Sequence, residues 1–363
     1  GSEEKKLVLE CLETSWISSE GPFVKEFETK LANFVSRKYG IAVTNGTSAL
    51  DLSIAALDIK KGDEVIVPTF TIISCVLQLI RIGAIPVLVD LDEKTWNMNV
   101  DQIEEKITIK TKAIMMVHIY SHPVDIDKVL NLAKKYDLKI IEDAAEMIGQ
   151  KYKDKYCGSF GDISTFSFYP NKNVTTGEGG MVVTNNINLA QRSKSLRNLC
   201  FQPEQRFVHD EIGWNYRMTN LQAALGLAQL ERLDESVEKK VSIGKAYYER
   251  LKEIDLIQLP LEKLDYSQNI FWVYGIVLDK RIGNAKYFMK KLADNNIGSR
   301  PFFYPIHKQP VFLKNGLFVN DFHPNSEYIS EYGFYLPSGL SITVNEIDIV
   351  TDTLKRLIKE KIN

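Results

Sequence analysis

The amino-acid sequence predicts an α/β protein with a mostly parallel central sheet, helices on both faces, and a smaller α+β unit after it. Short runs rich in Ile and Val recur at 63–70, 85–92, 112–120 and 138–145, and each ends in polar or turn residues. Between the last two runs, residues 126–137 carry apolar side chains at helical spacing. Apolar strands that alternate with helices are typical of a parallel sheet buried on both sides.

The second unit is predicted from a change of pattern late in the chain. Residues 216–254 show a long helical pattern without proline, and shorter strand and helix patterns follow it, such as "NIFWVYGIVL" and "AKYFMKKLADNN". A helix of that length commonly bridges two domains. We therefore expect a large domain over 1–237, including the N-terminal segment, and a small C-terminal domain over 238–363.

Composition excludes several classes of function. The 363 residues carry 45 Lys and Arg against 47 Asp and Glu, so no excess of basic charge is present to neutralise a nucleic acid. No apolar run of about 18 residues predicts a membrane span, and no signal peptide is recognisable. Four scattered cysteines without a CxxC pair indicate a reducing, cytoplasmic protein, and we expect no metal site.

The stretch "VTNGTSALDLSIAALDI" predicts a turn followed by an amphipathic helix. Gly46 would let the backbone approach a ligand closely, and Thr47 would open the helix with a hydroxyl and a free N–H group. Such a helix start binds phosphate well. Simple N-capping by Asn45 or Thr47 is the alternative interpretation.

Three further residues follow in an order that suits one cofactor. Asp143 ends an apolar strand, where a carboxylate can pair with a protonated ring nitrogen or cap the next helix. Ser167 lies five residues before Lys172, which stands between the aromatic run "FSFYP" and the glycine-rich run "TTGEGG". A solvated turn lysine is the simpler interpretation of Lys172. Taken together, a phosphate site, a carboxylate and an amine predict pyridoxal phosphate (PLP), whose aldehyde bonds to a lysine.

At this point the sequence resembles a known family, the sugar-nucleotide aminotransferases of the DegT/DnrJ/StrS type. The resemblance covers nearly the whole chain and includes "GDEVIVPTFT", "HIYSHPVDID", "EDAAE", "GDISTFSFYPNKNVTTGEGGMVVT", "IGWNYRMTNLQAALGLAQLE" and "RPFFYPIH". It implies the aspartate-aminotransferase (type I) fold of PLP-dependent transferases. It also implies transfer of the amino group of L-glutamate to C4 of a nucleotide-linked 4-keto-6-deoxyhexose. The products would be 2-oxoglutarate and a 4-amino-4,6-dideoxy sugar nucleotide of the perosamine or viosamine type.

The resemblance also assigns roles to individual residues. Lys172 would hold the cofactor covalently and carry the proton, with the pyridoxamine form (PMP) as the intermediate state, while Asp143 would pair with the ring nitrogen. Glu146 would lie near the 3-hydroxyl group of the cofactor. The phosphate would be bound by Gly46, Thr47 and Ser167. In a homodimer with shared active sites, Asn215 and Arg217 would reach the phosphate from the partner subunit. His122, Tyr304 and His307 are the candidates for substrate binding.

One departure from the family pattern concerns the cofactor ring. Family members usually place an aromatic residue against the ring, and here the matching position is Ile72. An aliphatic side chain can still cover the ring face, but this feature favours a second hypothesis, a catalytically silent binder of PLP or a sugar nucleotide. Amination at C3 is a third. Lys172 argues against the 3-dehydratase branch, in which histidine replaces the lysine. Trp96 and Trp272 are interpreted as packing residues.

Overall fold

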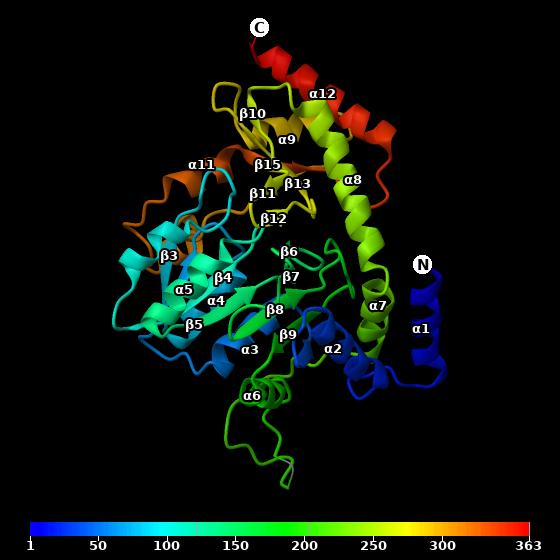
Figure 1. Cartoon of the computed structure of the whole chain (residues 1–363), viewed down its shortest axis with the longest axis vertical. Helices are drawn as coiled ribbons and strands as arrows, with labels where there is room; N and C mark the ends of the chain where they lie inside the picture. Colours follow the sequence, from blue (N-terminus) through cyan, green and yellow to red (C-terminus); the bar gives the residue numbers. More distant parts are fainter. Residues whose placement is uncertain (121, 203, 363) are drawn as a thin grey trace.

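The computed structural model describes residues 1–120, 122–202 and 204–362. Within these ranges its centre is a seven-stranded sheet (Figure 1). In spatial order the strands are β1 (Tyr39–Val43), β9 (Gly180–Thr184), β8 (Ile163–Ser167), β5 (Lys139–Asp143), β4 (Thr111–Val117), β2 (Glu64–Pro68) and β3 (Ile85–Val89). Strand β9 is antiparallel to both of its neighbours, and the pairs from β8 to β3 are parallel. The prediction of a mostly parallel sheet is therefore confirmed.

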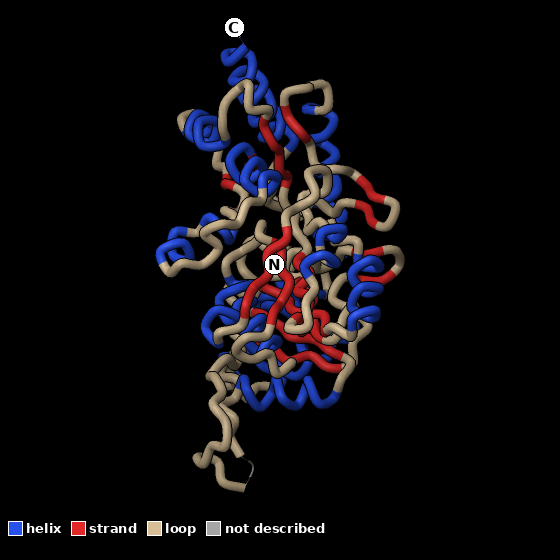
Figure 2. The backbone as a smooth tube through the Cα atoms, turned by 90° about the vertical axis from the view of Figure 1, so that its left-hand side faces the viewer, coloured by secondary structure: helices blue, strands red, loops and turns tan. Residues whose placement is uncertain are grey.

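Helices cover both faces of this sheet because alternate strand residues point to opposite sides. Ile41 and Val43 join one hydrophobic core, whereas Ala42 joins another. Figure 2 shows the strands between layers of helix. The first face is covered by α3 (Gly46–Ala56), α4 (Ser74–Ile82) and α6 (Ile187–Arg197). The opposite face is covered by α2 (Pro22–Phe34), α5 (Ile126–Tyr136) and α7 (Asn220–Leu230), and α1 (Ser2–Glu13) packs on α7.

The long helical pattern predicted over 216–254 forms two helices instead of one. Helix α7 ends at Leu230, and α8 (Leu233–Leu251) begins after a break at Glu231 and Arg232. Helix α8 then runs from the large sheet to the C-terminal part of the chain (Figure 1). The predicted domain boundary between residues 237 and 238 falls inside α8, and it stays a prediction.

The C-terminal part is built on a four-stranded antiparallel sheet. Its strands, in spatial order, are β10 (Ile257–Gln258), β13 (Tyr274–Leu278), β15 (Gly333–Leu336) and β14 (Arg300–Pro301). A core of its own joins this sheet to α8, α9 (Ala285–Ala293) and α12 (Val344–Ile362). The remaining elements are the hairpins β6 (Lys151–Tyr152) with β7 (Lys155–Tyr156) and β11 (Lys263–Leu264) with β12 (Ser267–Gln268), helices α10 (Pro310–Lys314) and α11 (Pro324–Tyr332), and the 3₁₀ turns Val100–Gln102, Glu104–Lys106 and Ile306–Lys308. None of the described helices is both long and apolar enough to cross a membrane.

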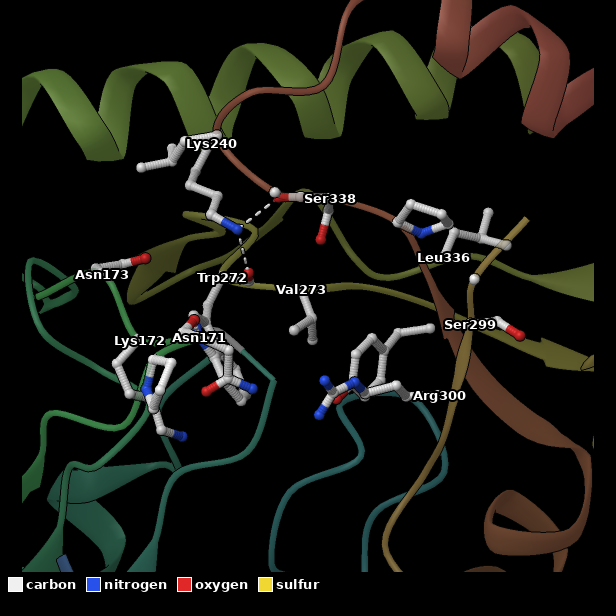
Figure 3. A pocket seen from close by; sticks show the side chains of 16 residues that line it. Asn171, Lys172, Asn173, Lys240, Trp272, Val273, Ser299, Arg300, Leu336 and Ser338 are labelled. Atoms are coloured by element: carbon white, nitrogen blue, oxygen red, sulfur yellow. Dashed lines mark hydrogen bonds between the residues drawn. The ribbon is translucent and has the colours of Figure 1, made fainter. Parts of the chain in front are cut away.

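A buried lysine of α8 fastens this helix to the smaller sheet. The ammonium group of Lys240 donates to the carbonyl oxygen of Trp272 at 2.8 Å and to that of Ser338 at 2.6 Å (Figure 3). Burial lowers the pKa of Lys240 to about 8. The group therefore holds the entrance to β13 and the segment after β15 in one place.

This lysine predicts a pH-dependent stability. Between pH 8 and 10 the unfolded chain binds the proton of Lys240 more tightly than the folded chain, so the free energy of unfolding should rise with pH. Relative to Lys240→Met, we expect the wild type to gain about 1 kcal/mol per pH unit in this window, measured by urea unfolding. The matched control is Lys239→Met, on the exposed side of the same helix. Equal pH slopes in the wild type and Lys240→Met would contradict the prediction.

Candidate active site

A cavity of about 300 Å³ opens at the carboxyl ends of the parallel strands. Ligands of open α/β sheets bind at this edge. Its polar lining comes from the segments that follow five strands of the large sheet, and Trp272, Pro301, Phe303 and Tyr335 close it from the smaller sheet. Six of the predicted site residues and Ile72 lie in this lining: Gly46, Thr47, Asp143, Glu146, Ser167 and Lys172.

Lys172 lies on the connection between β8 and β9, and its amine is held inside the cavity. The Nζ atom is 3.6 Å from Oε1 of Glu146 and 3.9 Å from the ring centre of Trp272, and the side chain is only 12% exposed. Burial lowers the pKa of Lys172, although the charges of Glu146 and Asp143 oppose this shift. A larger neutral fraction makes the amine a better nucleophile toward a carbonyl group. Lys172 is therefore not a solvated turn residue.

Asp143 ends β5 and is buried, with hydrogen-bond donors at both carboxylate oxygens. Oδ1 accepts from the backbone N–H of Ala145 at 3.0 Å and from the hydroxyl of Thr165 at 3.3 Å, while the thiol of Cys75 donates to Oδ2 at 3.4 Å. Burial raises the pKa of Asp143, and the bond from Ala145 opposes the rise. A fixed carboxylate of this kind can bind a cationic ring nitrogen in the cavity.

Glu146 follows Asp143 after one turn of chain and faces Lys172. It accepts the backbone N–H of Tyr120 at 2.9 Å, and burial raises its pKa to about 7. Burial thus acts in opposite directions on the amine and on its neighbouring carboxyl group, because it disfavours the charged form of each. Burial therefore brings the pKa values of the amine and the carboxyl group closer together than they are in water.

The start of α3 forms the opposite end of the cavity. Asn45 is the N-cap, and its side chain accepts the backbone N–H of Ser48 at 2.8 Å. A Cβ atom at position 46 would lie 2.8 Å from Cβ of Ser167, so only glycine leaves this space open. Thr47 shares a hydrogen bond of 2.8 Å with Ser74. The free N–H groups of the first turn, with the hydroxyls of Thr47 and Ser167, could bind an anion here. Asn45 supplies the predicted cap as well.

Comparison with known proteins assigns the chain to a family. The model of the DegT/DnrJ/EryC1/StrS aminotransferase family matches residues 1–355. The chain belongs to this family. It is an aminotransferase, as the amine, the carboxylate and the anion site of the cavity had indicated.

Several relatives match over almost their whole length. A GDP-perosamine synthase of Escherichia coli O157:H7 is 43% identical over 99% of this chain and 96% of that protein, and one of Caulobacter vibrioides is 40% identical over 98% and 95%. Among solved structures, an aminotransferase from Psychrobacter cryohalolentis is 28% identical, covers 99% of this chain and 97% of its own, and has a TM-score of 0.92. The type I fold is therefore confirmed.

The cofactor of this family is PLP, and the residues of the aminotransferase fit it. A protein from Streptococcus pneumoniae, Spr1654, was solved in its PLP form and is 25% identical, with a TM-score of 0.91 over 99% of this chain and 97% of its own. In the present chain the space that glycine leaves beside Ser167 suits the phosphate, Asp143 suits the ring nitrogen, and Lys172 suits the aldehyde. Ile72, 48% exposed, lies where it can cover the ring with an aliphatic side chain.

Three predicted substrate residues do not line the cofactor cavity of the aminotransferase. The two ring nitrogens of His122 bond with the hydroxyl of Ser267 at 2.9 Å and the carbonyl oxygen of Leu261 at 2.8 Å. His307 is buried between Thr69 and Glu327. Tyr304 is 53% exposed and is not part of the lining. The two histidines are committed to contacts that join distant segments, which leaves no ring nitrogen for a substrate in this structure.

Asn215 and Arg217 also lie outside the cavity. Arg217 forms a β-bridge with Val43 and donates to the side chain of Asn198, while Asn215 is exposed and bridges Asn198. A single chain of the aminotransferase therefore does not bring them to its own phosphate site. Their reach into a partner subunit stays a prediction.

A buried group of metal-ligating residue types adjoins the cavity, and one of its members, His118, also lines it. His118, Glu142 and Cys157 offer ligand atoms within 4.8 Å of one another. His118 also stands four residues from His122, a spacing that can hold a metal on a helix, but the two rings have different partners here. Glu142 already accepts from His118 and from the N–H groups of Gly158 and Phe160. These hydrogen bonds fix Glu142, the neighbour of Asp143 in β5, to the segments on either side of the strand.

Sequence reasoning missed several residues of the site. The indole of Trp272 contacts the amine of Lys172 and donates to the carbonyl oxygen of Asn171 at 2.7 Å, so it positions the reactive loop as well as packing. Trp96 is buried against Phe302, as predicted for a packing residue. Cys75 and Ser74, at the start of α4, bond with Asp143 and Thr47 of the site, and no sequence motif identified them. Their position at the start of the helix that follows β2 was the available signal.

Replacing Asp143 tests the role of the fixed carboxylate. We expect Asp143→Asn to slow the reaction with glutamate by roughly 10²- to 10⁴-fold, because an amide cannot hold a positive charge on the ring nitrogen. The half-reaction is followed through the cofactor absorbance. Asp127→Asn, an exposed aspartate paired with Lys153, is the control. Wild-type rates in Asp143→Asn would rule out this role.

Proposed function

We propose that this aminotransferase moves the amino group of L-glutamate to C4 of a nucleotide-linked 4-keto-6-deoxyhexose. The products would be 2-oxoglutarate and a 4-amino-4,6-dideoxy sugar nucleotide of the perosamine or viosamine type. The observation that carries this proposal is the near full-length similarity to three proteins called GDP-perosamine synthases, at 43%, 40% and 38% identity. GDP is accordingly the first nucleotide carrier to test, before UDP and dTDP.

The residues of the cavity have distinct tasks in such a reaction. When bound, PLP supplies an electron sink that makes the C–H bond next to the transferred nitrogen acidic. Lys172 anchors the cofactor, and its Nζ atom takes up and returns the proton in both half-reactions. Glu146, 3.6 Å away, lowers the cost of a charge on that amine. Asp143 holds the ring nitrogen, and the start of α3 with Ser167 holds the phosphate.

Two competing functions remain to be separated from this one. Amination at C3 needs the same residues. It differs in how the sugar lies in the site, because C3 and not C4 must reach the cofactor. A silent binder of PLP or a sugar nucleotide needs no buried amine with a lowered pKa. The burial of Lys172 against Glu146 supports catalysis over simple binding.

A panel of substrates tests the proposed reaction. With glutamate, the holoenzyme should convert a GDP-, UDP- or dTDP-linked 4-keto-6-deoxyhexose to the 4-amino sugar, identified by mass spectrometry and NMR. Lys172→Ala should lower turnover by at least about 10⁴-fold, because it removes both the anchor and the proton carrier, whereas Lys153→Ala should not. Borohydride should fix the cofactor on the peptide that contains Lys172. A wild-type enzyme that reacts with glutamate but with no 4-keto sugar would refute the proposed acceptor.

We also propose that the active enzyme is a homodimer with shared sites. Asn215 and Arg217 lie on the segment between α6 and α7, away from the cavity of their own chain. The same segment exposes Phe207 and Ile212, which are 79% and 89% exposed. Apolar side chains of this size at the surface support a protein contact. The four buried, free cysteines support a reducing compartment such as the cytoplasm.

Mixing two inactive variants tests the shared site. If Arg217 serves the partner's phosphate, mixed dimers of Lys172→Ala and Arg217→Ala contain one intact site. Random exchange of subunits should then restore about one quarter of the wild-type activity, because half the dimers are mixed. Sedimentation reports the dimer itself. Dimers that exchange subunits without recovering activity would show that both residues act within one chain.

A further inference from the structure

The indole of Trp272 lies directly against the reactive amine. Its ring centre is 3.9 Å from Nζ of Lys172, and Trp272 is only 3% exposed. An ammonium group over the face of an aromatic ring is attracted by the negative charge of that face, and tryptophan attracts it most strongly. The attraction grows where water is kept away, as it is at this buried contact.

Three contacts hold the indole in position. Its Nε1–H group donates to the carbonyl oxygen of Asn171, the residue next to the lysine, at 2.7 Å. The ammonium group of Lys240 donates to the backbone carbonyl oxygen of Trp272 at 2.8 Å (Figure 3). The ring also stacks on that of Tyr120, with 6.4 Å between the ring centres. The indole is thus fixed from the lysine loop, from α8 and from the large sheet, and its face stays against Nζ.

The carboxyl groups beside the amine do not supply a constant negative charge. Glu146 is 3.6 Å from Nζ, and burial raises its pKa to about 7, so it loses its charge as the pH falls through neutrality. Asp143 suits the ring nitrogen of the cofactor, whose positive charge would offset its own. Beyond the indole, Arg300 and Lys240 line an adjoining cavity and are cations themselves. Among the groups that attract the ammonium, the face of Trp272 is the one that neither titrates nor pairs with the cofactor.

We propose that Trp272 is a catalytic residue, whose indole face stabilises the positive charge of Lys172 whenever this amine is released from the cofactor. During transfer of an amino group, Nζ takes up the proton that leaves the substrate carbon and later returns it. The electron pair of the broken C–H bond stays with the substrate and the cofactor, so the amine becomes an ammonium group inside the cavity. The inference rests on the proposed role of Lys172 as proton carrier and does not depend on the sugar acceptor.

A simple cover over the amine is the alternative role for Trp272. The two roles predict opposite changes in the pKa of Lys172 when the indole is removed. Loss of a cover would admit water, which stabilises the ammonium form and raises the pKa. Loss of an attractive ring face would remove a partner of the ammonium form and lower the pKa. The sign of the change therefore separates the two roles.

The pKa of Lys172 can be measured in the pyridoxamine-loaded enzyme, where this amine is not bonded to the cofactor. Trace acetylation with acetic anhydride over a range of pH, read by peptide mass spectrometry, gives its reactivity relative to the exposed Lys25. In Trp272→Leu the pKa should fall by roughly 0.5 to 1.5 pH units, and Trp272→Phe, which keeps an aromatic face, should show a smaller fall. Trp96→Leu is the matched control, because Trp96 is equally buried but packs against Phe302.

Fluorinated tryptophan gives a second readout that leaves the shape of the site almost unchanged. Fluorine withdraws electrons from the ring and weakens the charge of its face, on which the attraction depends. Wild-type enzyme produced with mono- and difluorotryptophan should show a stepwise fall in the pKa of Lys172, whereas Trp272→Phe produced in the same way should show none.

A raised or unchanged pKa in Trp272→Leu would overturn the proposal, and so would a pKa that ignores fluorination in the wild type. If Trp272→Leu does not bind the pyridoxamine cofactor, the fluorinated wild type decides. No sugar is present in these measurements, so their failure is distinct from a failure of the proposed acceptor.

Discussion

The burial of one amine among two carboxyl groups is the constraint on which the site depends. Taking Lys172 out of water lowers its pKa, and the same burial raises the pKa values of Asp143 and Glu146. None of the three could be tuned in this way on an exposed turn, because water would stabilise each charged form. The fold must therefore enclose the loop that carries Lys172 while leaving room for a ligand.

Several contacts enclose that loop. The backbone N–H of Thr176 donates to the carbonyl oxygen of Phe168 at 3.0 Å. The side-chain amide of Asn173 donates to the carbonyl oxygen of Ile148 at 3.1 Å. From the smaller sheet, Trp272 holds Asn171 and covers the amine. The large sheet thus supplies the reactive groups, and the C-terminal part supplies the cover.

The predictions that succeeded depended on local patterns. The four apolar runs became β2 to β5, and the residues Gly46, Asp143, Ser167 and Lys172 met because carboxyl ends of neighbouring strands lie together. Residues whose role depends on a distant partner could not be predicted. Trp272 contacts a residue 101 positions away, and His122 pairs with one 145 positions away. No periodicity records such distances, so the contact between Trp272 and the reactive loop was missed, and the role of His122 in substrate binding stays a prediction.

The reversed direction of β9 has a consequence for how the protein assembles. Strand β9 lies between β1 and β8, and Val43 of β1 pairs with Gly180 of β9, although the two are far apart in sequence. A Cβ atom at position 180 would lie 2.4 Å from the carbonyl oxygen of Asn45, so the phosphate end and the lysine loop meet only when this strand has inserted. Joining such distant segments is slow compared with forming local helices. The appearance of cofactor colour during refolding would therefore mark a late, long-range event, after most helical signal has already returned.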